Sequence, residues 1–74
     1  MDKRKNIVGM KLRELRLARG YSQRDLVRKC ELLGYPMSQN MVSRIENGRR
    51  RVTDIDLFVF MEVFQVPSTS LLEN

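Results

Sequence analysis

The sequence has no histidine and no tryptophan, and its one cysteine is Cys30. Without histidine it lacks the side chain that most often serves in acid–base catalysis and that commonly binds zinc. One cysteine cannot form an internal disulfide, and we expect Cys30 to be a small buried hydrophobic residue. Neither a pair of carboxylates placed for acid–base chemistry nor a glycine-rich phosphate loop is present. The composition therefore predicts a protein that is not an enzyme and that uses no cofactor, no metal and no small-molecule ligand.

Long hydrophobic runs are missing as well. No stretch is long enough to cross a bilayer, and the basic start at residues 1–5 lacks the apolar segment of a secretory signal. Hydrophobic residues make up 42% and charged residues 31% of the 74 positions, which is the composition of one globular domain. We therefore expect a cytoplasmic protein with no membrane partner.

Positive charge is absent from the last third of the chain. Residues 1–51 carry all 14 Lys and Arg against five acidic residues, whereas residues 52–74 carry four acidic residues and no Lys or Arg. The first segment would bind a polyanion favourably, because binding would release the counterions condensed on it. The second would be repelled by that polyanion and should face away from it. A basic surface that only aids solubility is the alternative.

Few glycines and prolines interrupt the chain, and they divide it into five helical segments. Apolar residues recur at helical spacing, as at Val8, Leu12 and Leu15. Ser22 and Thr53 are each followed three residues later by aspartate, which is typical of a capping box at a helix start. No stretch alternates as a β-strand does. The predicted helical segments cover residues 6–19, 22–33, 38–46, 53–64 and 68–72.

The third segment carries the most informative side chains. Val42 and Ile45 form its apolar face, and this turns four polar side chains toward another, exposed face. These are Gln39, Asn40, Ser43 and Arg44. Side-chain amides and guanidinium groups can pair bidentately with adenine or guanine edges in a major groove. Taken alone, the same residues also suit an ordinary solvated helix face.

Arg49, Arg50 and Arg51 follow the third segment directly. Three neighbouring guanidinium groups repel one another unless an anion compensates, and the planar fork of arginine suits phosphate. A solvated turn is the alternative. A basic N-terminal arm over residues 1–6 is a second candidate for contact with DNA, although it could equally be a frayed terminus.

In their order and spacing, three groups of residues resemble the helix-turn-helix family of phage repressors, Cro proteins and XRE-like regulators. The first group runs from Val8 to Leu26, the second from Met37 to Gly48 and the third from Val66 to Leu72. The resemblance covers about residues 7 to 72. It implies an all-α, compact, five-helix repressor-like domain over residues 7–74, with the helix-turn-helix at the second and third helices.

The resemblance also implies roles for individual residues. Gln23 matches a residue that holds a phosphate and braces the next helix. Arg16 and Glu46 match positions that form a structural ion pair between the first and third helices. The positions that correspond to DNA contacts are Gln23, Ser38, Gln39, Asn40, Ser43, Arg44, Asn47, Arg49, Arg50 and Arg51.

The segment between Ser22 and Ser38 is longer than in the shortest family members. The extra stretch lies near residues 31–36, and we expect it to lengthen the second helix and its turn. This change affects the angle of the third helix, and with it the choice of residues that face the bases.

The fourth segment is apolar nearly all round, and a small domain rarely buries every face of a helix. Phe58, Val59 and Val63 are therefore candidates for a self-association surface, unless the fifth segment covers them. The favoured hypothesis is a homodimeric transcriptional regulator that binds double-stranded DNA with residues 38–46 in the major groove, and the family resemblance implies that it is a repressor. The alternative is an antitoxin-like or transcription-bridging module that binds another protein through the fourth segment.

Overall fold

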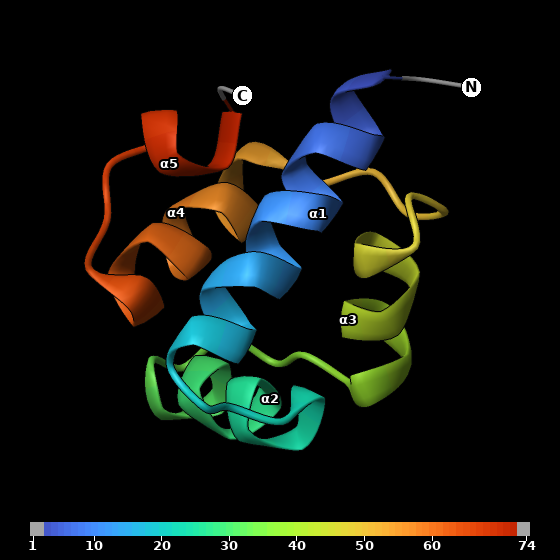
Figure 1. Ribbon diagram of the computed structural model, residues 1–74. Coiled ribbons are helices and arrows are strands. Elements are labelled where there is room, and N and C mark those ends of the chain that lie inside the picture. Colours follow the sequence, from blue (N-terminus) through green and yellow to red (C-terminus); the bar gives the residue numbers. More distant parts are fainter. Residues whose placement is uncertain (1–2, 73–74) are drawn as a thin grey trace.

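Five α-helices make up the structure, a computed structural model that describes the backbone of residues 3–72 and the side chains of residues 7–72 (Figure 1). The helices are α1 (Lys3–Ala18), α2 (Gln23–Leu32), α3 (Gln39–Glu46), α4 (Asp54–Phe64) and α5 (Thr69–Leu72). No strand occurs within residues 3–72. This confirms the predicted all-α fold of five helices.

The first helix starts earlier than expected. It begins at Lys3 rather than near residue 6, because residues 3–6 include neither glycine nor proline and are mostly good helix formers. The backbone of residues 3–6 therefore belongs to α1 instead of forming a separate arm. The remaining part of the proposed basic arm, Met1 and Asp2, and the side chains of residues 1–6 lie outside the described residues.

Both predicted capping boxes form. The Ser22 hydroxyl accepts a hydrogen bond from the Asp25 N–H at 3.0 Å, and the Asp25 carboxylate accepts one from the Ser22 N–H at 2.8 Å. The bond from the Ser22 N–H to this carboxylate, and after it the Ser22 hydroxyl as a hydrogen-bond donor, lower the pKa of Asp25. Thr53 and Asp56 repeat the arrangement at the start of α4, with two bonds of 3.1 Å. Local sequence thus sets where these two helices begin.

The core lies between α1 and the other four helices. α1 crosses the molecule with α3 packed against one side and α5 against the other, while α2 packs against both α3 and α4 (Figure 1). The fully buried side chains of the core include Leu12 of α1, Ile45 of α3 and Phe60 of α4. Cys30 is buried in the same cluster, and burial raises the pKa of its thiol to about 11. The neutral thiol therefore packs as a hydrophobic residue.

The extra stretch between α2 and α3 is anchored in the fold. α2 ends at Leu32, so the stretch is only partly helical, and residues 33–38 form the connection to α3. Within that connection the Tyr35 hydroxyl donates a hydrogen bond to the Asp56 carboxylate, which is completely buried at the start of α4. This bond raises the pKa of Tyr35, because ionised tyrosine cannot donate it. Tyr35 therefore ties the longer connection to α4.

Gly9 allows α1 to lie close to the last turn of α3. A Cβ atom at this position would overlap the carbonyl oxygen of Ile45 and lie 3.2 Å from that of Glu46. Both obstacles are backbone atoms, so they cannot move aside as a flexible side chain would. The absence of a side chain at Gly9 sets the distance between α1 and α3.

Gly9→Ala is therefore expected to lower the free energy of unfolding by about 1–3 kcal/mol, as overpacking does. Helix propensity alone would instead raise the free energy of unfolding, since alanine is a better helix former than glycine by about 1 kcal/mol. Urea unfolding of the variant measures the difference. Met10→Ala, at the neighbouring exposed position, is the control and should change stability by about 0.5 kcal/mol or less. A stabilised Gly9→Ala variant would contradict the close approach.

Candidate nucleic-acid interface

α3 divides into a buried face and an exposed face. Val42 and Ile45 are completely buried. Gln39, Asn40 and Arg44 are exposed, and Ser43 is half-buried. The polar side chains of the predicted recognition surface thus share the outer face of one short helix.

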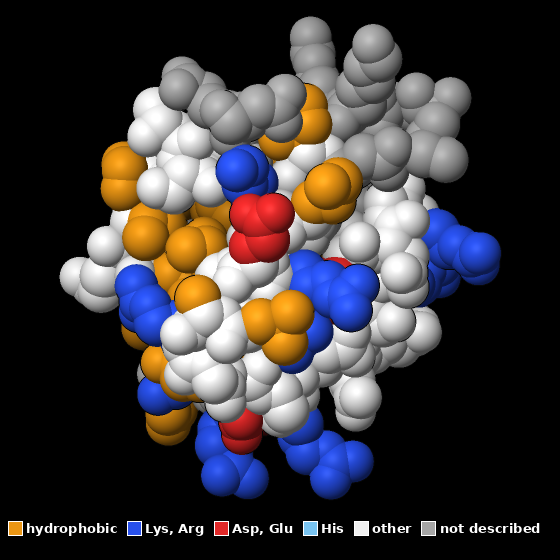
Figure 2. Space-filling view, viewed as in Figure 1, with side chains coloured by type: hydrophobic (Ala, Val, Ile, Leu, Met, Phe, Trp, Pro, Cys, Tyr) orange, Lys and Arg blue, Asp and Glu red, His pale blue; other side chains and the backbone are white. Residues whose placement is uncertain are grey.

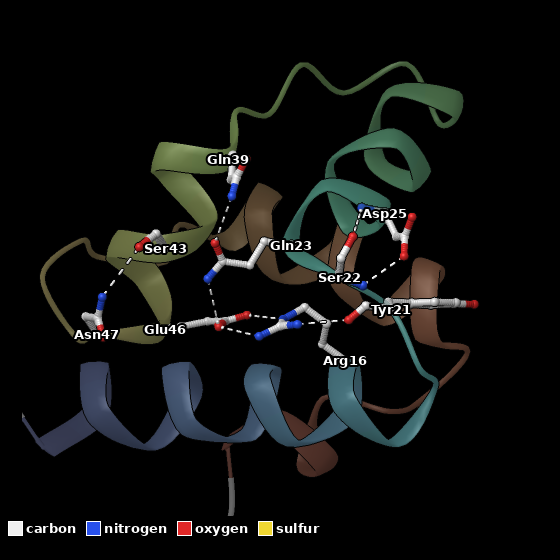
Figure 3. A network of polar contacts seen from close by, with 9 residues as sticks. All are labelled: Arg16, Tyr21, Ser22, Gln23, Asp25, Gln39, Ser43, Glu46 and Asn47. Atoms are coloured by element: carbon white, nitrogen blue, oxygen red, sulfur yellow. Dashed lines mark hydrogen bonds and ion pairs between the residues drawn. The ribbon is translucent and has the colours of Figure 1, made fainter.

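A buried ion pair joins α3 to α1. Arg16 donates from Nε to Glu46 Oε2 at 2.7 Å and from Nη2 to Glu46 Oε1 at 3.0 Å, so the pair is bidentate (Figure 3). The side chain of Arg16 is 10% exposed and that of Glu46 is 4% exposed. Arg16 also donates from Nη1 to the carbonyl oxygen of Tyr21 at 2.8 Å, which fixes the turn before α2. One guanidinium therefore holds α1, the α1–α2 turn and the end of α3 together.

Gln23 extends this network to the start of α3. Its Nε2 donates to Glu46 Oε1 at 3.2 Å, and its Oε1 accepts from Gln39 Nε2 at 3.5 Å (Figure 3). The chain of contacts thus runs from the buried Arg16 to the exposed amide of Gln39. With one of its donors held by Gln23, the Gln39 amide is restricted in orientation before any ligand binds.

The two ends of α3 are closed by side chains of the predicted site. At the start, the Ser38 hydroxyl accepts from the Met41 N–H at 3.1 Å and caps the helix. At the end, Asn47 Nδ2 lies 3.5 Å from Ser43 Oγ, to which it donates (Figure 3). Ser38 and Asn47 are both exposed, so each can contact a neighbouring group while it completes the helix.

The arginine triplet lies directly at the end of α3, but its members differ. The backbone N–H groups of Arg49 and Arg50 both donate to the carbonyl oxygen of Arg44, at 2.8 and 3.2 Å. The side chains of Arg49 and Arg51 are exposed, whereas Arg50 is half-buried. Two of the three guanidinium groups are therefore free to meet an anion beside α3.

One basic residue near the site was not predicted from the sequence. Arg24 is exposed in the first turn of α2, immediately after Gln23. A cation next to outward-pointing N–H groups at a helix start favours an anion there. The signal for Arg24 in the sequence was its position in the first turn after the helix-capping residue Ser22. Arg19, by contrast, donates to the carbonyl oxygen of Phe64 at 2.7 Å and so closes the end of α4.

The apolar residues of α4 also differ in how far they are exposed to solvent. Phe58 is 64% exposed, whereas Val59 and Val63 are half-buried and pack against the core. Ile55, which the sequence analysis did not single out, is 61% exposed one turn before Phe58 and Val59. In the view of Figure 2, hydrophobic side chains gather over α4 and α5, while Lys and Arg side chains reach the edge of the molecule beside α2 and α3. α4 thus presents two exposed apolar side chains and carries no Lys or Arg.

The chain belongs to the helix-turn-helix domain family, whose model matches residues 7–73. Searches of curated proteins and of solved structures found no match. A helix-turn-helix domain suggests DNA binding by a small regulator. Within the described part of the chain, no helix has the length and hydropathy needed to span a membrane.

Glu46→Ala should lower the free energy of unfolding by about 3–5 kcal/mol, because it leaves Arg16 buried without its carboxylate. Thermal or urea unfolding gives the value. Glu14→Ala is the matched control: Glu14 also pairs with a cation, Lys11, at 3.7 Å, but its side chain is 64% exposed. We expect a loss of about 0.5 kcal/mol or less there. Equal losses at the two positions would rule out a special role for the buried pair.

Proposed function

We propose that this helix-turn-helix chain is a sequence-specific regulator of the phage repressor and Cro (XRE-like) type that binds double-stranded DNA with α3 in the major groove. The observation that carries the proposal is the outer face of α3, where Gln39 and Arg44 are exposed beside the network anchored by Arg16 and Glu46. The proposed activity is binding, not catalysis.

Direct reading of bases is assigned to the exposed side chains of α3. An amide such as Gln39 can donate to and accept from one adenine, and a guanidinium such as Arg44 can donate twice to one guanine. Asn40 and Ser43 lie on the same helix and complete this surface. Discrimination requires a fixed donor, since a freely rotating side chain adapts to several bases. The contact from Gln23 restrains Gln39 in this way.

Contacts with the phosphates are assigned to the residues at both ends of α3. Such contacts fix the position of a helix in the groove without reading sequence. At the start these are Gln23, Ser38 and the newly found Arg24; at the end they are Asn47 and the basic loop of residues 49–51. The acidic segment 52–74 then faces away from the duplex, as its charge requires.

The proposed assembly is a homodimer that buries the exposed apolar residues of α4. Phe58 and Ile55 would form its centre, with Val59 and Val63 at its edge. A two-fold dimer would place two copies of α3 in successive major grooves, about 34 Å apart on one face of the duplex. Occupancy at a promoter would then block polymerase and give repression.

The second candidate function rests on the same apolar face. An antitoxin-like or transcription-bridging module would use Ile55 and Phe58 to bind a different protein. Oligomeric state separates the two functions, because the first requires a homodimer and the second a monomer that associates with another chain.

Gln39→Ala should reduce the preference for a specific site by about 1–3 kcal/mol, while binding to random duplex changes little. The specific duplex comes from selection of a random pool at a stated salt concentration, and titrations of both duplexes give the ratio of dissociation constants. Thr69→Ala, at an exposed position of α5, is the control and should leave the ratio unchanged. An equal loss on both duplexes for Gln39→Ala would argue against base reading by this amide.

Phe58→Asp should convert the dimer to a monomer, since it places a charge in the centre of the apolar contact. Sedimentation measures the mass, and the circular dichroism spectrum should remain helical because Phe58 does not belong to the core. Leu32→Asp, which changes an even more exposed apolar residue on α2, should leave the dimer intact. A monomeric wild-type protein at the concentration of the assay would favour the protein-binding module.

A further inference from the structure

The two ends of α3 are held in different ways. The last turn is fixed by the buried, bidentate ion pair between Arg16 and Glu46. At the start, the contact between Gln23 and Gln39 is a single bond of 3.5 Å between two amides, which is long for a hydrogen bond. This contact alone leaves the start of α3 less well fixed than its end.

Tyr35 supplies an anchor close to that start. Its backbone N–H donates to the carbonyl oxygen of Cys30 at 3.0 Å, and its hydroxyl donates to the carboxylate of Asp56. Tyr35 thus joins the end of α2 to the start of α4, within the connection that runs on to α3 (Figure 1). Ser38, which caps α3, follows three residues later, so the Cα atoms of Tyr35 and Ser38 are at most about 11 Å apart.

The link between Tyr35 and Ser38 is stiff. Pro36 has a fixed φ angle and restricts the backbone of the residue before it. Met37 is buried and packs in the core cluster, but burial of apolar surface has no preferred direction. The hydrogen bond of Tyr35 does have one. A displacement of Tyr35 therefore moves the capping residue Ser38, and with it the first turn of α3.

The carboxylate that accepts this bond is fixed by its surroundings. Asp56 is completely buried, and its Oδ2 accepts a hydrogen bond from the Thr53 N–H at 3.1 Å. Its Oδ1 accepts from the Tyr35 hydroxyl. Removal of that hydroxyl would leave Oδ1 buried without this donor, which is costly. The contact therefore favours one position of Tyr35 over others.

We propose that Tyr35 is a positioning residue, which through its bond to Asp56 sets where the first turn of α3 meets the bases. Gln39 and Asn40 lie in this turn and depend on Tyr35, whereas Arg44, in the last turn, depends on the ion pair at that end. The inference rests on the proposed function, since it concerns the reading of bases. Tyr35 itself is assigned no contact with DNA.

Amide hydrogen exchange of Tyr35→Phe tests the anchor without DNA. The substitution removes the hydroxyl but keeps the ring. The N–H of Val42, which donates to the Ser38 carbonyl oxygen in the first turn, should exchange about tenfold faster than in the wild type. The N–H of Asn47, at the other end of α3, should exchange at a nearly unchanged rate. Equal acceleration at both ends would overturn the proposal, because it would report only a loss of overall stability.

Thr53→Ala is the control matched in stability. It removes the hydroxyl that caps α4 through a bond of 3.1 Å from the Asp56 N–H, but it keeps the bond from Tyr35. Both variants should lower the melting temperature by about 4–8 °C. Only Tyr35→Phe should accelerate exchange more at Val42 than at Asn47, and the same pattern in Thr53→Ala would overturn the assignment.

Base preference tests the part that concerns DNA. Duplexes of the selected site with single base-pair changes show, through Gln39→Ala and Arg44→Ala, which base pairs each side chain reads. Tyr35→Phe should reduce the preference about tenfold at the base pairs read by Gln39 and leave it unchanged at those read by Arg44. The slope of log K against log salt should stay the same, since no phosphate contact is lost. Equal losses at both sets of base pairs, or the same losses in Thr53→Ala, would overturn the proposal.

The two experiments separate the inference from the function on which it rests. A wild-type protein that binds no duplex would overturn the proposed function. Hydrogen exchange would still decide whether Tyr35 holds the start of α3. Greater acceleration at Val42 than at Asn47 supports the anchor, and equal acceleration overturns it.

Discussion

The buried ion pair between Arg16 and Glu46 determines how the outer face of α3 is presented. A buried pair of this kind adds little net stability over apolar residues of the same volume, because both charges lose their hydration. Its effect is on geometry: the bidentate contact admits one orientation of α3 relative to α1. Gln23 then carries this orientation from Glu46 to Gln39 at the other end of the helix. The position of the exposed Gln39 amide thus depends on a charge pair hidden from solvent.

The distribution of arginine shows why net charge overstates the size of a polyanion-binding surface. Arg16 pairs with Glu46, and Arg19 closes the end of α4 at Phe64. Both guanidinium groups donate to a buried or terminal acceptor within the fold. Those left at the surface near α3 are Arg44, Arg49, Arg51 and Arg24. A small domain thus uses arginine to join its own elements as well as to carry charge at its surface.

Sequence reasoning succeeded where the determining contact is local. The capping boxes of α2 and α4 each span three residues, and the apolar stripe of α3 repeats every three to four, so both can be recognised in a linear chain. It missed distant contacts that neither a local pattern nor the family resemblance indicated, whereas the resemblance did indicate the Arg16–Glu46 pair, 30 residues apart. The Tyr35–Asp56 bond joins positions 21 residues apart, and no local pattern distinguishes Arg50 from Arg49. The start of α1 was misjudged because helix formers without a cap mark no boundary. Ile55 was overlooked because an all-apolar helix gives no signal of which side is exposed.

α4 connects the two surfaces on which the proposed function depends. Asp56 is buried and, through Tyr35, holds the connection that leads into α3; its neighbours on either side along the helix include the exposed Ile55 and Phe58. A helix of 11 residues behaves as a rigid rod, so a contact made at Phe58 has a fixed relation to Asp56. In a two-fold dimer the distance between the recognition helices must match one turn of DNA, and flexible links would blur that distance. The buried Asp56 thus fixes the relation between the two proposed surfaces, the apolar one that would join two copies and the polar one that would meet the duplex.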